Sequence, residues 1–161
     1  MRFLTHAGAS ALLVGLTLSL QCAGMGVLIQ WATAYFARYT SSIGPFRAAI
    51  LIVRFTAAIV VLHLSQILLW AVFFRWTCLT SWESAFYFST TNYSTVGSGD
   101  LLLPGMWRTV GALESITGVL MCGLSASFLF TLVLRFVEQE RRFAPAAARP
   151  DEEFAGKRRY S

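Results

Sequence analysis

The segment Ser94-Thr95-Val96-Gly97-Ser98-Gly99-Asp100 contains the residue types and spacing best suited to binding an ion. Gly97 and Gly99 flank a single residue, and glycine adopts backbone angles that other residues avoid. Such angles let successive carbonyl oxygens face one axis, where they can replace the hydration shell of a cation. Because long apolar stretches lie on both sides, we expect the segment to be buried in protein or to line water.

The composition indicates that a membrane is the solvent of this chain. Of its 161 residues, 56% are hydrophobic and only 13% are charged. A soluble domain carries about twice that share of charged residues. A chain of this length could not bury so much apolar surface in a soluble fold, so we expect its long apolar runs to cross a bilayer.

Acidic residues are concentrated around the glycine-bearing segment. Before residue 137 the chain has three acids, Glu83, Asp100 and Glu114, and all three lie in or beside that segment. Exclusion of charge from apolar runs explains why acids are missing elsewhere, but not why these three cluster. Ionisable groups at membrane depth indicate a functional site.

Three apolar stretches are long enough to cross the hydrocarbon core. The first, within residues 1–40, has no charge from residue 8 to residue 36 and is predicted to be a transmembrane helix. A cleaved signal peptide is the alternative. The other two predicted helices cover residues 46–74 and 109–136, and the mixed-charge tail 137–161 follows.

A shorter helix is predicted for residues 82–93. Ser81 is a suitable N-cap, and Glu83 complements the dipole of the first turn. Such a helix would be about 18 Å long, enough to enter the membrane halfway. The chain would then return through residues 95–100. The predicted fold class is therefore an all-α membrane protein with three transmembrane helices, a re-entrant helix and a loop.

His63, Gln66 and Trp70 share one face of the second apolar helix. The interpretation that we favour is hydrogen bonding to neighbouring helices, as is usual for polar side chains in membranes. A proton-sensing role of His63 is the alternative.

The positive charges predict the topology. Arg135, Arg141, Arg142 and the basic residues of the tail place the C-terminus in the cytoplasm, which makes the chain a multi-pass protein of the plasma (inner) membrane. Counting back through three spans puts Arg38 and Arg47 inside and the Asp100 end of the loop outside. Arg2 is then left outside, in mild conflict with the rule.

Residues 95–100 resemble the filter of the potassium channel superfamily, Thr-Val-Gly-Tyr-Gly-Asp, in five of six positions. Residues 46–136 resemble the two-span pore module of that family. The pattern Trp107-Arg108, Gly111-Ala112-Leu113-Glu114 and Gly118 is similar to that of small bacterial potassium-channel-like proteins with an extra first helix.

The resemblance implies roles for single residues. The ions would be bound by carbonyl oxygens of the filter, with the Thr95 hydroxyl at the innermost site, and Asp100 would form the outer mouth. Gly118 matches a hinge position and Phe130 a hydrophobic gate; helix packing and a lipid-facing position are their alternatives. The implied ion-binding residues are Thr95, Val96, Gly97, Ser98 and Gly99.

Ser98 departs from the family pattern, which has an aromatic brace at this position. We expect Glu114 to support the filter instead, through a hydrogen bond to Thr91, Asn92 or Tyr93, while Tyr87 holds Asp100. If this support is looser than an aromatic brace, sodium would permeate along with potassium.

One chain carries one filter strand, so the resemblance implies a homotetramer in the lipid bilayer. The implied function is passive, potassium-permeable cation conduction, with no cofactor besides permeant K⁺ and Na⁺, no nucleic acid and no enzyme activity. A weakly selective channel and a non-conducting modulatory subunit are the alternatives. A remote one is an intramembrane serine hydrolase with Ser98 and His63, although Gly-x-Ser-x-Gly is absent.

Overall fold

The computed structural model describes residues 2–38, 44–97, 99, 101, 103–105 and 107–143. These residues form four helices and no strand: α1 (Arg2–Arg38), α2 (Pro45–Thr77), α3 (Trp82–Tyr93) and α4 (Arg108–Phe143). Three stretches are long and apolar enough to span a membrane, namely Gly8–Arg38, Phe46–Thr77 and Arg108–Arg141. The prediction of an all-α chain with three membrane-length helices is confirmed. The predicted tail lies outside the described residues beyond Phe143.

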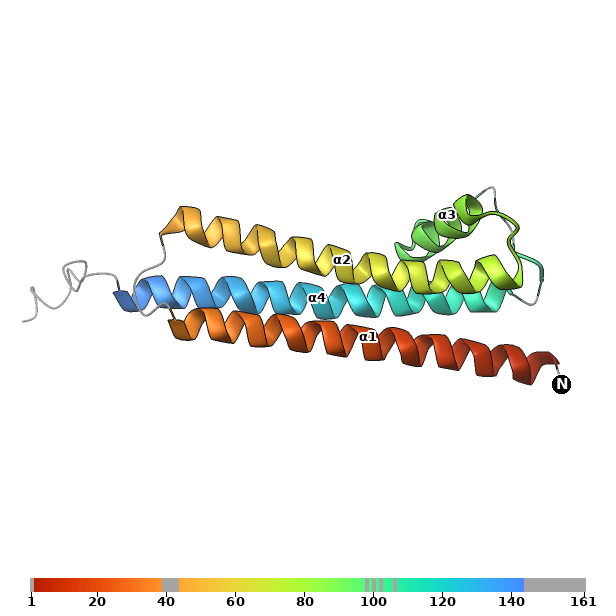
Figure 1. Cartoon of the computed structure of the whole chain (residues 1–161), viewed down its shortest axis with the longest axis horizontal. Coiled ribbons are helices and arrows are strands. Elements are labelled where there is room, and N and C mark those ends of the chain that lie inside the picture. The colour runs from red at the N-terminus through yellow and green to blue at the C-terminus, as the bar shows by residue number, and fades with distance from the viewer. Residues whose placement is uncertain are drawn as a thin grey trace, which may run out of the picture.

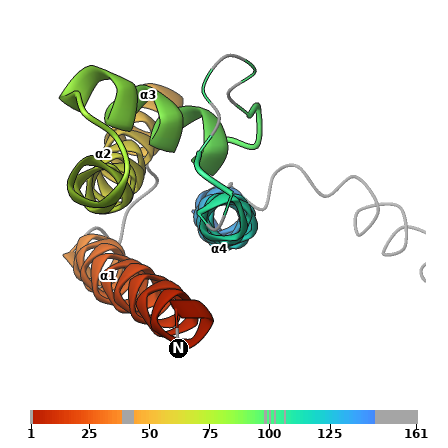
Figure 2. The ribbon, with the colours of Figure 1, turned by 90° about the vertical axis from the view of Figure 1, so that its right-hand side faces the viewer.

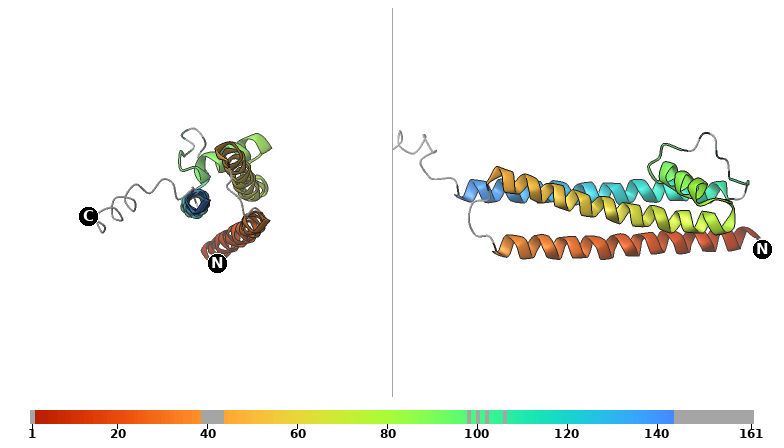
Figure 3. Two further views of the ribbon diagram at one scale, coloured as in Figure 1. Left: turned by 90° about the vertical axis from the view of Figure 1, so that its left-hand side faces the viewer. Right: turned by 45° about the horizontal axis from the view of Figure 1, so that its top comes forward.

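The three long helices lie side by side, and α2 runs antiparallel to α1 and α4 (Figure 1). Viewed along the bundle, they occupy three corners of a triangle (Figure 2). The short helix α3 lies near the end of the bundle where α2 ends and α4 begins, on the side of these two helices away from α1 (Figure 3). α3 packs mainly on α2 and α4, whereas α1 packs on α2 and α4 from the opposite side.

Local sequence signals set the ends of the helices. Pro45 begins α2, where its missing N–H costs nothing. The Ser81 hydroxyl caps α3 by accepting a hydrogen bond of 3.0 Å from the Ser84 amide, and Glu83 lies in the first turn. The α3 helix covers the residues expected from the sequence, whereas α2 and α4 extend beyond the ranges 46–74 and 109–136.

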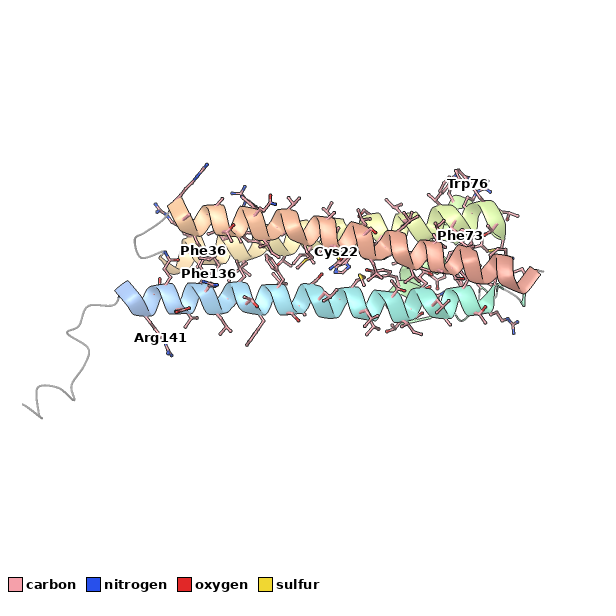
Figure 4. All side chains as sticks on the ribbon, turned by 90° about the horizontal axis from the view of Figure 1, so that it is seen from below. Cys22, Phe36, Phe73, Trp76, Phe136 and Arg141 are labelled. Carbon is pink, nitrogen blue, oxygen red and sulfur yellow. The ribbon has the colours of Figure 1, made fainter. Side chains whose placement is uncertain are left out.

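The interior of the bundle has two apolar ends and a polar middle. Phe36 and Phe136 meet at the end near the C-terminus with ring centroids 5.0 Å apart (Figure 4), and the buried Phe74 and Phe88 meet at the other end, also 5.0 Å apart. Between these ends lie buried polar side chains from all four helices. They are Thr17, Gln21, Gln66, Ser89, Glu114, Thr117 and Ser125.

Large apolar side chains cover the outside of the long helices. Leu12, Val53 and Val61 are each about two-thirds exposed. In water such a surface would favour aggregation, but it suits a lipid environment. Near the C-terminal end of the bundle, the Arg54 guanidinium stacks over the Trp31 ring at 5.2 Å.

Candidate ion pore

The loop after α3 has an unusual backbone. Thr95 has a φ angle of 64° and Gly97 one of 76°, while Val96 between them is not left-handed. Left-handed angles are strained for a β-branched residue such as threonine. Alternation between the two hands turns successive carbonyl groups of a strand toward the same side. Gly97 therefore has the left-handed backbone that the sequence predicts for it, whereas Gly99, for which the same freedom was expected, is not left-handed.

Hydrogen bonds hold this loop against the end of α3. The Ser94 amide donates to the Thr90 carbonyl at 3.1 Å, and the Thr95 amide donates to Asn92 at 2.9 Å. The Gly97 amide donates to the Thr91 carbonyl at 3.0 Å. The last carbonyls of α3 thus receive partners that a helix end otherwise lacks, and the strained loop is fixed to a regular helix.

Two glycines allow α4 to approach α3 closely. A Cβ atom on Gly118 would overlap the backbone carbonyl of Tyr93. A Cβ atom on Gly111 would lie 2.9 Å from the side-chain nitrogen (Nδ2) of Asn92. The Ser115 hydroxyl, between these glycines, donates to the Asn92 carbonyl at 2.8 Å. The structure thus places Gly118 in a packing contact under the end of α3, and its predicted role as a hinge stays a prediction.

Glu114 is fully buried between α3 and α4. Its Oε1 atom accepts a hydrogen bond of 2.5 Å from the Ser89 hydroxyl, which also lies 2.9 Å from the Ile67 carbonyl of α2. Asn92 is the other polar side chain beside this carboxyl. The Oε2 atom has no hydrogen-bond partner among the described residues. Glu114 therefore joins α4 to the middle of α3.

Of the three partners expected for Glu114, Asn92 lies beside its carboxyl, whereas Thr91 and Tyr93 bond elsewhere. The Thr91 hydroxyl bonds within its own helix, to the Tyr87 and Phe88 carbonyls at 2.9 and 3.0 Å. Tyr93 bonds to residues of α2. Ser89 takes their place because it shares a face of α3 with Asn92, three residues further on, and this face lies on α4.

Tyr93 is the residue through which α3 meets α2. Its hydroxyl donates to the Oε1 atom of Gln66 and lies 2.9 Å from the Nδ1 atom of His63. Gln66 in turn donates to Gln21 of α1 at 2.7 Å, and the Trp70 indole donates to Thr17 at 3.0 Å. The polar face of α2 therefore serves interhelical hydrogen bonding, as expected.

An open pocket of about 290 Å³ lies beside the loop. Its walls come from the loop, α3 and α4, and include Phe88, Asn92, Gly97, Leu103 and Gly111. The pocket is open at the surface of the single chain, so no described residue of this chain fills the space on this side of the loop.

The remaining predicted site residues lie at the surface of the single chain or outside the described residues. Thr95, Val96, Gly97 and Gly99 are exposed, as are Tyr87 and Phe130. Ser98 and Asp100 lie outside the described residues, so the predicted contact between Tyr87 and Asp100 stays a prediction.

Sequence reasoning missed Ser89, Ser115 and Gln21. Serine at these positions is indistinguishable from an ordinary small residue of a helix. Gln21 had a stronger signal, because an amide in a charge-free span needs a partner. Its partner could not be named without knowing that α1 packs on the Gln66 face of α2.

Comparison with known proteins identifies the family of this chain. The family model described as ion channel matches residues 49–135, which is more than half of the chain. No curated protein matches it, and no solved structure does. The match covers most of α2, all of α3 and most of α4, the three helices that surround the loop. The chain therefore belongs to the ion channel family.

Proposed function

We propose that this chain forms a potassium-permeable cation channel in which four identical copies bring their loops together around one axis. The observation that carries the proposal is the alternating backbone of Thr95 and Gly97, fixed to the end of α3. Strained backbone of this kind is concentrated at functional sites. Carbonyl groups from several such strands would coordinate an ion in place of water.

The tetramer follows from the same loop. In a single chain Thr95, Val96 and Gly97 are exposed, and their carbonyl groups would be without water or protein partners at membrane depth. A closed ring of four chains places these groups around a hydrated, ion-filled axis. Phe130, exposed toward the other end of α4, would then be available as the hydrophobic gate of the pore.

The ion selectivity depends on how firmly the outer part of the loop is held. The serine at position 98 favours a weaker brace than an aromatic side chain gives, and an open pocket lies beside Gly97. We infer that potassium passes and that sodium is excluded less strongly than by a fully braced filter.

The experiment is ion flux through the purified chain in liposomes. Potassium should enter faster than sodium, and a large organic cation should not enter at all. The matched variants are Gly97→Ala, which strains a left-handed position, and Gly105→Ala, where an added Cβ meets nothing within 4 Å. Flux should fall in the first and persist in the second. Crosslinking should reach a tetramer.

The same preparation tests the alternatives. Absence of flux from a correctly assembled tetramer would support a non-conducting subunit. Equal flux of sodium and potassium would support a weakly selective channel. Crosslinking that never passes a dimer would contradict the proposed pore.

A further inference from the structure

A chain of hydrogen bonds crosses the whole bundle at the level where α3 ends. It joins His63 of α2, Tyr93 of α3, Gln66 of α2 and Gln21 of α1, and it reaches α4 at Ser125 and the Met121 carbonyl. Gln21, Gln66, Tyr93 and Ser125 are each at most 3% exposed. Buried amides need such partners, because an unpaired one carries a full desolvation cost.

The direction of every bond in this chain is fixed by its last acceptor. A backbone carbonyl only accepts, so the Nε2 atom of Gln21 faces Met121 at 3.4 Å and Ser125 at 3.1 Å. The Oε1 atom of Gln21 therefore accepts from the Nε2 atom of Gln66, at 2.7 Å. This leaves the Oε1 atom of Gln66 to accept from the Tyr93 hydroxyl.

The single hydroxyl proton of Tyr93 also determines which nitrogen of His63 carries a proton. A tyrosine hydroxyl has one proton, and that of Tyr93 goes to Gln66. His63 must then donate through Nδ1, which lies 2.9 Å from the Tyr93 oxygen. All donors thus point the same way, from His63 to α4, and bonds aligned in this manner polarise and strengthen one another.

Tyr93 connects this chain of bonds to the pore loop. It is the last residue of α3, and its backbone rests on Gly118. Thr95, the first left-handed residue, follows two positions later. A side chain anchored in the bundle on one side and a backbone packed on α4 on the other fix the angle at which the loop leaves the helix.

We propose that Gln21 is a positioning residue for the loop after α3, residues 94–97. α1 would then help to hold the pore in shape, although the family match begins only at residue 49. This inference rests on the proposed channel function for its effect on selectivity. Gln21 acts through Gln66 and Tyr93, and it ties the loop to α4 through Ser125. Displacement of α4 relative to α1 would therefore reach the loop through this residue.

The test compares Gln21→Met with Gln30→Met in the full-length chain in lipid. Methionine has a similar volume to glutamine and no amide, and Gln30 lies exposed on the same helix. The first readout is deuterium exchange of the amides of Ser94, Thr95 and Gly97, which needs no ion conduction. We expect exchange to be about threefold faster in Gln21→Met, because loss of an interhelical hydrogen bond of average strength in a membrane changes an opening equilibrium by about this factor. Gln30→Met should match the unmodified chain.

The second readout is the potassium-to-sodium permeability ratio. It should fall in Gln21→Met and in Tyr93→Phe, with no further fall in the double variant, because both changes interrupt one chain of bonds. The Ser84 amide, at the other end of α3, should exchange at an unchanged rate. A uniform rise in exchange along α3, or effects of the two changes that add, would overturn the inference.

Failure of the proposed function is distinguishable from failure of this inference. If the unmodified chain does not conduct, the proposed channel function is wrong. Deuterium exchange of the amides of residues 94–97 still decides the role of Gln21. If Gln21→Met does not assemble, Ser125→Ala is tested instead. This substitution removes the hydroxyl at the α4 end of the hydrogen-bond series and changes the side-chain volume little. Unchanged loop exchange in that variant would overturn the inference.

Discussion

At the scale of the residue, Glu114 and Ser89 form a buried polar pair in which each side chain depends on the other for a hydrogen bond, even if the pair adds little to the free energy of unfolding. The pair is buried, and one oxygen of Glu114 has no partner among the described residues, so its desolvation is only partly compensated. The loss of one partner is therefore more costly than the replacement of both by apolar side chains.

We expect Ser89→Ala to lower the free energy of unfolding by about 2 kcal/mol, because it removes the hydroxyl hydrogen bonded to the buried Glu114 carboxyl. The double variant Ser89→Ala/Glu114→Leu should be more stable than Ser89→Ala alone. The measurement is chemical denaturation of the assembled protein in detergent, with Ser127→Ala on the exposed face of α4 as the control. A double variant less stable than the single one would contradict this account.

Position 98 gives a second prediction at this scale. Ser98→Tyr should raise the potassium-to-sodium permeability ratio, because an aromatic ring would supply the brace that serine is too short to give. The reversal potential in mixed sodium and potassium measures the effect. Ser98→Ala, which adds no brace, is the control, and an equal ratio in both variants would refute the explanation.

At the scale of the element, the position of α3 depends on how closely α4 approaches it. Gly111, Ser115 and Gly118 form one face of α4, and each lies against Asn92 or Tyr93. Two of the three have no side chain, and the third donates a hydrogen bond. Close helix approach through small residues is a common means of packing in membranes.

Gly118→Ala should destabilise the assembled protein by about 1–3 kcal/mol, because the added Cβ meets the backbone of Tyr93, which cannot rotate away. Gly123→Ala is the control on the same helix, since its Cβ would meet nothing within 4 Å. In that variant the better helix propensity of alanine should be neutral or stabilising. The midpoint of thermal unfolding in detergent distinguishes the two.

The sequence was sufficient for the elements but not for their contacts. Apolar runs and the Ser81 cap predicted the helices, because both signals are local in the chain. The partner of Glu114 depends on the crossing of α3 and α4, and that of Gln66 on the packing of α1. Left-handed Thr95 was also missed, because glycine was the expected residue for such angles. Contacts between helices and strain at a non-glycine residue are decided by tertiary structure.

At the scale of the whole molecule, the distribution of basic residues between the two ends of the bundle predicts its orientation in the membrane. Arg38 and Arg141 lie at the end near the C-terminus, and Trp76 and Trp82 lie exposed at the opposite end. The excess of positive charge predicts that the first end faces the cytoplasm. The loop after α3, at the opposite end of the bundle, would then face the outside (Figure 1).

Labelling of introduced cysteines tests this orientation. Trp76→Cys should react with a membrane-impermeant thiol reagent in intact cells, and Arg141→Cys only after permeabilisation. Background from Cys78 should be slow at neutral pH and rise as the pH rises, because burial raises the pKa of its thiol and leaves little thiolate. The opposite labelling pattern would reverse the assigned topology.

The length of α2 has a mechanical consequence. A helix of 33 residues is about 50 Å long, whereas the hydrocarbon layer is about 30 Å thick. The axial rise from Arg54 to Trp76 is about 33 Å, so Arg54, stacked on Trp31, would lie near one border of the hydrocarbon if Trp76 lies at the other. A thicker bilayer would pull charged Arg54 into hydrocarbon unless the helices tilted less, which couples the inclination of the whole bundle to membrane thickness.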